Sequence, residues 1–179
     1  MRFFTTSSSN RNYTYLIESL MQIKKENLTF EIIITGRNSK FNSNSIPKIL
    51  NENFFFFEKV SFSKLYKIVK SSDYIFIPLD PENKKDIIFK NRKVTGSAQL
   101  VYGFLKPAII NQEFSYFYNF NSKNKILLIY NNSNLYNVMK KAILLKKKDY
   151  INLQRNLITT EKIIYQTSIN NIKKVINKT

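Results

Sequence analysis

The chain has 179 residues, 43% of them hydrophobic and 15% aromatic, which supports one folded domain with a buried core and excludes a mostly disordered chain. It contains neither cysteine nor histidine, which excludes a disulfide framework, a thiolate metal site and histidine as a general base. The formal net charge is +17, so we expect anionic partners such as nucleic acid, phosphorylated ligands or an anionic membrane surface. Compositional drift in an AT-rich genome is the alternative source of this charge.

The first half of the chain alternates strand and helix patterns. Apolar runs predict four strands: Arg2–Thr5, Phe30–Thr35 (ended by Gly36), Phe54–Phe57 and Tyr74–Ile77. A 3.6-residue period predicts one helix over 11–25 and another that begins at Ser61, a suitable helix cap. The polar segment 37–52, broken at Ile46-Pro47, predicts a loop with a short helix.

The second half continues the alternation after a long basic loop over 80–95. A short apolar helix leads to a strand at Ala108–Ile110, and another strand at Lys125–Tyr130 leads to a helix with apolar residues from Leu135 to Ala142. Residues 111–125 are aromatic and have no clear period. From about 149 to 177 the pattern is helical, and we predict two helices separated near Thr159-Thr160.

Strands that alternate with helices of 10–15 residues are typical of βαβ units with right-handed crossovers. We therefore predict an α/β fold, a Rossmann-like doubly wound and mostly parallel sheet of about six strands, with helices on both faces and further helices at the C-terminus. No linker divides the sequence, so residues 1–179 are expected to form a single domain. Ligands of such sheets bind beyond the carboxyl ends of the strands, which here are followed by the loops Thr5–Asn10, Gly36–Ser45, Pro78–Thr95 and Asn111–Phe120.

The most informative stretch is Lys93–Ile110. It has the pattern of a basic loop, a Thr95-Gly96-Ser97 turn that starts a helix, and then a proline before a strand. A helix N-terminus exposes unpaired N–H groups and carries a positive partial charge, so it can hold a phosphate. Gly96 allows close approach of the backbone, and Lys93 adds a full charge. Simple turn geometry and one solvated lysine among many are the alternatives.

Several segments, in order and spacing, resemble the C-terminal, nucleotide-sugar-binding domain of bacterial GT-B glycosyltransferases of the capsule and lipopolysaccharide biosynthesis type. They are Arg11-Asn12-Tyr13, Phe30–Gly36, Lys59–Tyr66 with Ser72–Pro81, Lys93–Pro107 and Ile129–Asn132. The resemblance covers nearly the whole chain from residue 3. It implies a hexosyltransferase-type enzyme that takes a nucleotide-sugar as donor and a glycan or lipid-linked molecule as acceptor.

The resemblance also implies roles for individual residues. The donor diphosphate would be bound by Lys93, Thr95, Gly96, Ser97 and Arg11, and the donor sugar or nucleotide by Asp80 and Gln99. Lys93, Arg11 and the positive end of the helix would stabilise the leaving diphosphate without a metal or another cofactor. No catalytic residue is assigned. Each residue also has a plainer interpretation: Arg11 as a helix-end charge, Asp80 as a turn residue before a proline, and Gln99 as a surface side chain.

The sequence departs from the family in three respects. Many retaining relatives bracket the Lys93–Pro107 loop with two glutamates, and this sequence lacks that pair. The loop Thr5–Ser9 contains no glycine, and the acceptor-binding domain of the family has no counterpart here. A non-catalytic truncated remnant, or one subunit of a split enzyme with a separate N-terminal half, is therefore the alternative to an active transferase. The aromatic residues Phe114, Tyr116, Phe117, Tyr118 and Phe120 would either pack against that other half of the cleft or form a stacking platform.

Partners and location follow from the same observations. The start of the chain lacks the apolar core of a signal peptide and no apolar run approaches the ~20 residues that span a bilayer, so we expect a cytoplasmic protein. Peripheral contact with the anionic inner face of a membrane would suit a lipid-linked acceptor. A basic nucleic-acid-binding protein is disfavoured, because the basic residues are spread along the chain and no recognised motif for nucleic acid is present.

Overall fold

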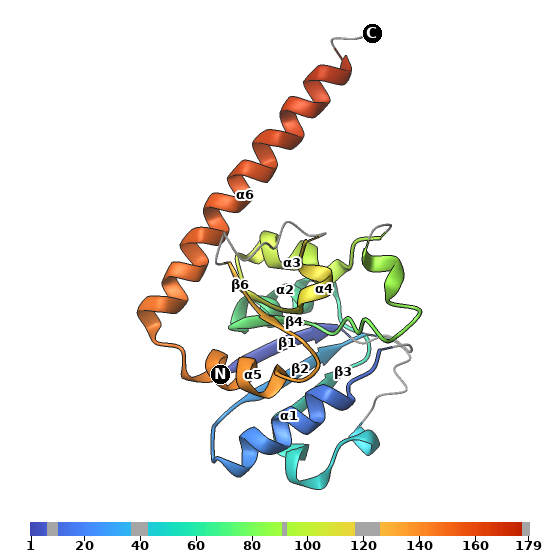
Figure 1. Ribbon diagram of the computed structural model, residues 1–179, viewed down its shortest axis with the longest axis vertical. Helices are drawn as coiled ribbons and strands as arrows, with labels where there is room; N and C mark the ends of the chain where they lie inside the picture. Colours follow the sequence, from blue (N-terminus) through green and yellow to red (C-terminus); the bar gives the residue numbers. More distant parts are fainter. Residues whose placement is uncertain (7–10, 37–42, 91–92, 117–125, 177–179) are drawn as a thin grey trace.

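A six-stranded, entirely parallel sheet forms the centre of the molecule, with the strand order β3-β2-β1-β4-β5-β6 (Figure 1). The computed structural model describes residues 1–6, 11–36, 43–90, 93–116 and 126–176. The strands are β1 (Arg2–Thr6), β2 (Glu31–Thr35), β3 (Phe54–Phe57), β4 (Tyr74–Ile77), β5 (Ala108–Asn111) and β6 (Leu127–Tyr130). This order confirms the predicted Rossmann-like doubly wound fold, and it places the topological switch point between β1 and β4.

Helices cover both faces of the sheet (Figure 1). The α-helices are α1 (Thr14–Lys25), α2 (Phe62–Ser71), α3 (Gly96–Phe104), α4 (Gln112–Ser115), α5 (Leu135–Leu144) and α6 (Lys147–Ile176). Short 3-10 helices η1 (Ser43–Ser45) and η2 (Lys48–Asn53) precede β3, and η3 (Ile87–Lys90) lies in the segment that was predicted as a loop over 80–95.

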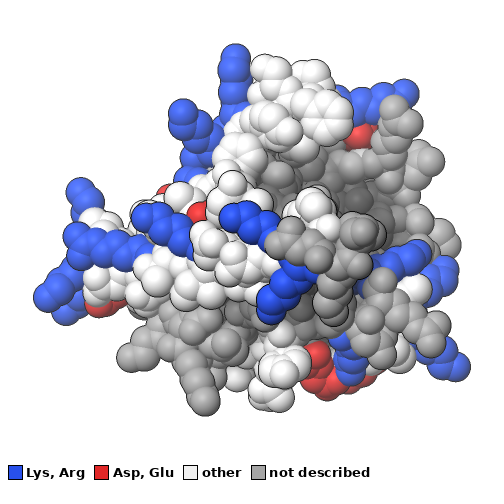
Figure 2. All heavy atoms as spheres, turned by 90° about the horizontal axis from the view of Figure 1, so that it is seen from above, with Lys and Arg blue, Asp and Glu red and all other residues white. Residues whose placement is uncertain are grey.

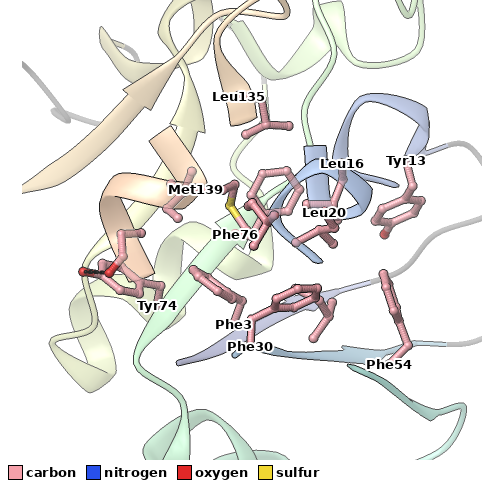
Figure 3. Packing of buried hydrophobic residues seen from close by; sticks show 14 of the residues in the cluster. Phe3, Tyr13, Leu16, Leu20, Phe30, Phe54, Tyr74, Phe76, Leu135 and Met139 are labelled. Carbon is pink, nitrogen blue, oxygen red and sulfur yellow. Dashed lines mark hydrogen bonds between the residues drawn. The ribbon is translucent and has the colours of Figure 1, made fainter. Parts of the chain in front are cut away.

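The core consists of two hydrophobic clusters, one on each face of the sheet. Phe3 belongs to the cluster that α1 and α5 cover, and Phe4 belongs to the cluster that α2 and α3 cover. Successive residues of a strand point to opposite faces, so an unbroken apolar run is what a sheet covered on both sides requires. Figure 3 shows the first cluster, where Phe3, Phe76 and Tyr74 meet Leu20 of α1 and Met139 of α5.

The C-terminal helix corrects one prediction. Residues 147–176 form one continuous helix, α6, instead of two pieces separated near Thr159-Thr160. The Thr159 hydroxyl donates to the Arg155 carbonyl at 3.2 Å, and Thr160 is buried. Threonine lowers helix propensity only slightly, and without a glycine or proline the backbone hydrogen bonds continue through the pair.

Basic side chains are spread over the one face of the molecule that Figure 2 shows. On the face seen in Figure 2, Lys and Arg side chains lie at the top, left and right edges and across the centre, and fewer Asp and Glu side chains are visible. Within the ranges that the structure describes, no helix is both long and apolar enough to cross a membrane.

Candidate functional site

The N-terminus of α3 lies at the switch point of the sheet. The Thr6 hydroxyl at the end of β1 and the Ser97 hydroxyl in the first turn of α3 share a hydrogen bond of 2.8 Å. Thr95 caps the helix, because its side-chain oxygen accepts the Ala98 N–H at 3.2 Å. Thr95 and Ser97 are buried while Gly96 is exposed, so the backbone of the first turn faces outward at Gly96.

A cavity of about 500 Å³ lies beside this helix start. It is formed at the carboxyl ends of β1, β2 and β3 and at the N-terminus of α2, and it is lined by Thr6, Thr35, Gly36, Glu58, Lys59, Val60, Ser61 and Leu65. Thr6 therefore contacts both the cavity and the first turn of α3. Gly36 has a φ of 146°, a backbone conformation that favours glycine.

The sequence analysis did not assign Glu58, Lys59 or Ser61 to a ligand site. Ser61 was identified only as a helix cap, and its hydroxyl does accept the Lys64 N–H at 3.3 Å. A signal was nevertheless present, since all three residues follow directly after the carboxyl end of a predicted strand, where ligands of such sheets bind.

Two of the predicted ligand residues are exposed near the start of α3. Lys93 lies just before the helix, and its backbone N–H donates to the Ile88 carbonyl at 3.1 Å. Gln99 lies in the first turns of the helix. The structure thus brings Lys93, the Thr95–Ser97 turn and Gln99 to one end of α3.

Arg11 was predicted to bind the donor diphosphate, but its side chain already contacts other residues of the protein. Its guanidinium forms an ion pair with Asp86, and both side chains are largely buried. The guanidinium carbon also lies 4.9 Å from the centre of the Phe89 ring. Burial raises the pKa of the Asp86 carboxyl, while the Asp80 backbone N–H and the charge of Arg11 oppose that rise. Arg11 therefore anchors the segment after β4 to the start of α1.

Asp80 organises the turn that follows β4. Its carboxylate accepts one hydrogen bond from the Asn12 side chain at 3.1 Å and another from the Glu82 backbone N–H at 3.0 Å. The residue is buried. The structure therefore gives Asp80 the turn-forming role, and contact with a donor sugar stays a prediction.

A second hollow, of about 400 Å³, lies beyond the carboxyl ends of β5 and β6. Its lining is rich in amides and carboxylates: Pro81, Glu82, Asn111, Gln112, Glu113, Asn131, Asn132 and Ser133. The Asn111 side chain donates to Asn132 at 3.0 Å, which ties the two strand ends together. The sequence analysis assigned none of these residues.

The aromatic segment after β5 is only partly described. Phe114 is buried in the core, whereas Tyr116 is 87% exposed. Phe117, Tyr118 and Phe120 lie outside the described residues, as do residues 7–10 of the loop after β1. Among the residues that the structure describes, no group of three or more carboxylates is placed to hold a metal ion.

Comparisons with known proteins identify the fold. The sequence matches no family model and no curated protein. Among solved structures, two trehalose-6-phosphate synthase chains superpose with a TM-score of 0.63 at 11% identity, and one of them, from E. coli, holds UDP-2-fluoro glucose. The alignments cover 90% and 97% of this chain but only 40% and 43% of the synthase chains. The chain thus shares the Rossmann-like fold of part of a GT-B glycosyltransferase and spans less than half of its length.

Proposed function

We propose that this chain is the donor-binding domain of a glycosyltransferase that transfers a sugar from a nucleotide-sugar to a surface-glycan or lipid-linked acceptor. The observation that carries the proposal is the N-terminus of α3, capped by Thr95 and tied to β1 through Thr6 and Ser97, at the switch point of the sheet. The fold shared with trehalose-6-phosphate synthase supports it.

The diphosphate of the donor would lie at the first turn of α3. Backbone N–H groups at Gly96 and Ser97 point out of the helix start, where the helix dipole favours negative charge. As the bond between sugar and phosphate breaks, charge develops on the leaving diphosphate, and these fixed dipoles together with Lys93 would stabilise it. This arrangement supplies positive charge from the protein alone, and no metal is proposed.

The nucleoside of the donor would occupy the 500 Å³ cavity next to this turn. The cavity combines apolar side chains such as Leu65 and Val60 with polar groups such as Ser61, which suits a flat base and a hydroxylated ribose. Because Thr6 contacts both the cavity and Ser97, one ligand can reach both places.

Calorimetric titration with UDP, GDP and a panel of UDP-, GDP- and CMP-sugars tests the proposal. Gly96→Val is the informative variant, because a Cβ at Gly96 meets no atom within 4 Å and the added bulk would project only into the ligand. Gly103→Val in the last turns of the same helix is the matched control, since its Cβ also meets no atom within 4 Å.

We expect saturable binding of one nucleotide family, weakened at least tenfold by Gly96→Val and unchanged by Gly103→Val. Lys93→Ala should weaken binding as well, and more strongly at low salt, because its contribution is a charge at an exposed position. A folded chain that binds none of these nucleotides would overturn the proposal.

A split or truncated transferase is the second candidate. The observation that favours it is the coverage of only 40% to 43% of the synthase chains. A split enzyme would bind the donor but neither release free sugar nor transfer it to an acceptor. Turnover would appear only when a separate N-terminal half is added, and this distinguishes a split enzyme from a complete one. Assignment to capsule or lipopolysaccharide synthesis rests on the resemblance of the sequence and is part of this proposal.

A further inference from the structure

The N-terminal half of α6 crosses one edge of the sheet (Figure 1). Tyr150 and Leu153 pack against the hydrophobic cluster on one face, and Leu157 is buried in the cluster on the other face. The strand at this edge is β6, the last strand in the order of the sheet. Successive side chains of a strand point to its two faces, so its outer edge carries none. The space between β6 and α6 must therefore be filled by side chains of the helices.

The residues of α6 that lie opposite this edge are short and polar, and they leave a cavity of about 640 Å³. Asn152 and Asn156, one turn apart on α6, line it. We call this space the β6 edge cavity. Six of its described lining residues are aliphatic, and they come from β6, α5, the residue after α5, and α6: Leu127, Leu128, Ile129, Val138, Leu145 and Leu153.

The size and lining of the β6 edge cavity are those of a small-molecule site. Such sites measure about 300–1,000 Å³ and combine mostly apolar walls with a few polar groups. None of the described lining residues is aromatic, so the walls favour a flexible aliphatic ligand over a flat ring. Its described lining shares no residue with that of the 500 Å³ cavity proposed for the nucleoside. The two sites are therefore separate.

Lysine residues lie beside the β6 edge cavity. Lys141 lines it, and Lys146–Lys148 connect Leu145 to Asp149, which both line it. All four lysines are exposed, and among the described residues none of them forms an ion pair. The start of α6 adds a positive partial charge, which disfavours cations there. Four lysines against one aspartate leave this part of the surface positive.

We propose that the β6 edge cavity binds an anionic amphiphile, one aliphatic chain that ends in a carboxylate or a phosphate group. The chain would contact the aliphatic walls, and the anion would lie beside Lys141 and Lys146–Lys148, where it offsets the repulsion among the lysines. A small anion would leave the apolar walls in water, and an uncharged chain would leave the lysines unpaired. An amphiphile meets both demands. This proposal goes beyond the proposed function and does not rest on it.

Calorimetric titration of the full chain with sodium octanoate, decanoate and dodecanoate, each below its micelle concentration, tests the proposal. We expect one saturable site whose affinity rises about fourfold for each added CH₂ group, because each buried CH₂ contributes a similar free energy. Decanol, which lacks the charge, should bind about tenfold more weakly than decanoate. Absence of saturable binding, or an affinity that does not depend on chain length, would overturn the proposal.

Two pairs of variants locate the site. Val138→Trp places bulk in the cavity and should weaken decanoate binding about tenfold, whereas Val175→Trp, at a position 68% exposed in the last turn of α6, should not. Lys141→Glu should weaken decanoate but not decanol, and Lys67→Glu makes the same change of charge on α2 as its control. Equal effects within either pair would contradict the proposed site.

Two further measurements separate the possible outcomes. Circular dichroism shows whether Val138→Trp folds, and the exposed Lys141→Glu keeps the test valid if it does not. Nucleotide titration of both variants should match that of the unchanged chain, so failure of the amphiphile site and failure of the donor site are distinguishable. Flotation with vesicles of phosphatidylcholine and phosphatidylglycerol identifies the source of the chain: binding lost in Val138→Trp supports a membrane lipid, and binding kept in Val138→Trp supports a free amphiphile.

Discussion

At the scale of single residues, the ion pair between Arg11 and Asp86 ties the segment after β4 to the start of α1. The two charges are largely removed from water, and each compensates the other. The Asp86 carboxylate also accepts the Asp80 N–H, and the Arg11 guanidinium also lies over the Phe89 ring. Breaking such a pair is costly because the remaining charge stays buried without its partner. Arg11 thus acts on the position of the segment after β4, and its contact with a donor stays a prediction.

Arg11→Ala is predicted to lower the free energy of unfolding by about 3 kcal/mol. Lys24→Ala is the control: it removes the ion pair with the exposed Glu52 and should cost less than about 1 kcal/mol. Urea unfolding followed by circular dichroism measures both. If the two variants lost equal stability, the structural role assigned to Arg11 would be wrong.

Buried tyrosines make the fold sensitive to alkaline pH. Burial raises the pKa of Tyr102 to about 12, and burial likewise raises the pKa values of Tyr13, Tyr74, Tyr130 and Tyr150 above their usual range. The unfolded chain ionises its tyrosines near pH 10, so above that pH it releases protons that the folded chain retains.

The stabilising effect of these tyrosines is therefore complete below about pH 10 and is lost as the pH rises toward 12. We expect the urea midpoint to fall over this range, together with a rise in tyrosinate absorbance. Tyr102→Phe should make the fall shallower, since it removes one of the groups that titrate. A midpoint that does not change between pH 9 and pH 11 would contradict the assignment.

At the scale of elements, the start of α3 depends on one cap. The Thr95 side chain accepts the Ala98 N–H, and the same turn presents the backbone that is proposed to meet the diphosphate. Thr95→Ala should cost about 1 kcal/mol of stability, and it should also weaken donor binding because the first turn frays. Thr95→Ser keeps the hydroxyl and should restore both properties. Thermal unfolding and nucleotide titration provide the two measurements.

Strands and helices were predictable to different degrees. The bounds of β3 and β4 agree with the prediction, because each is a short apolar run between polar or proline-containing turns. The division of α6 near Thr159-Thr160 was wrong, since weak helix propensity at two residues does not end a helix whose hydrogen bonds continue. The short helix α4 was missed because it has only four residues, and a 3.6-residue period becomes visible only over several turns.

At the scale of the whole molecule, the positive net charge and the positive groups of the proposed site lead to the same expectation, donor binding without a metal ion. The chain carries 29 basic and 12 acidic residues, and the proposed diphosphate site is built from a helix start and a lysine. We therefore expect donor binding that is unchanged by EDTA and by added Mg²⁺ or Mn²⁺. Calorimetric titration with and without chelator measures this, and a strict requirement for a divalent cation would refute the metal-free mechanism.

The sequence by itself determined the alternation of strands and helices and hence the fold class, because apolar period, caps and proline breaks act over a few neighbouring residues. It also pointed to the Thr95-Gly96-Ser97 turn. Only the tertiary structure decided that Arg11 meets Asp86, 75 residues away, and that Thr6 meets Ser97, 91 residues away. The order of the strands in the sheet creates these contacts. Local patterns in a sequence do not indicate which strand ends will lie side by side.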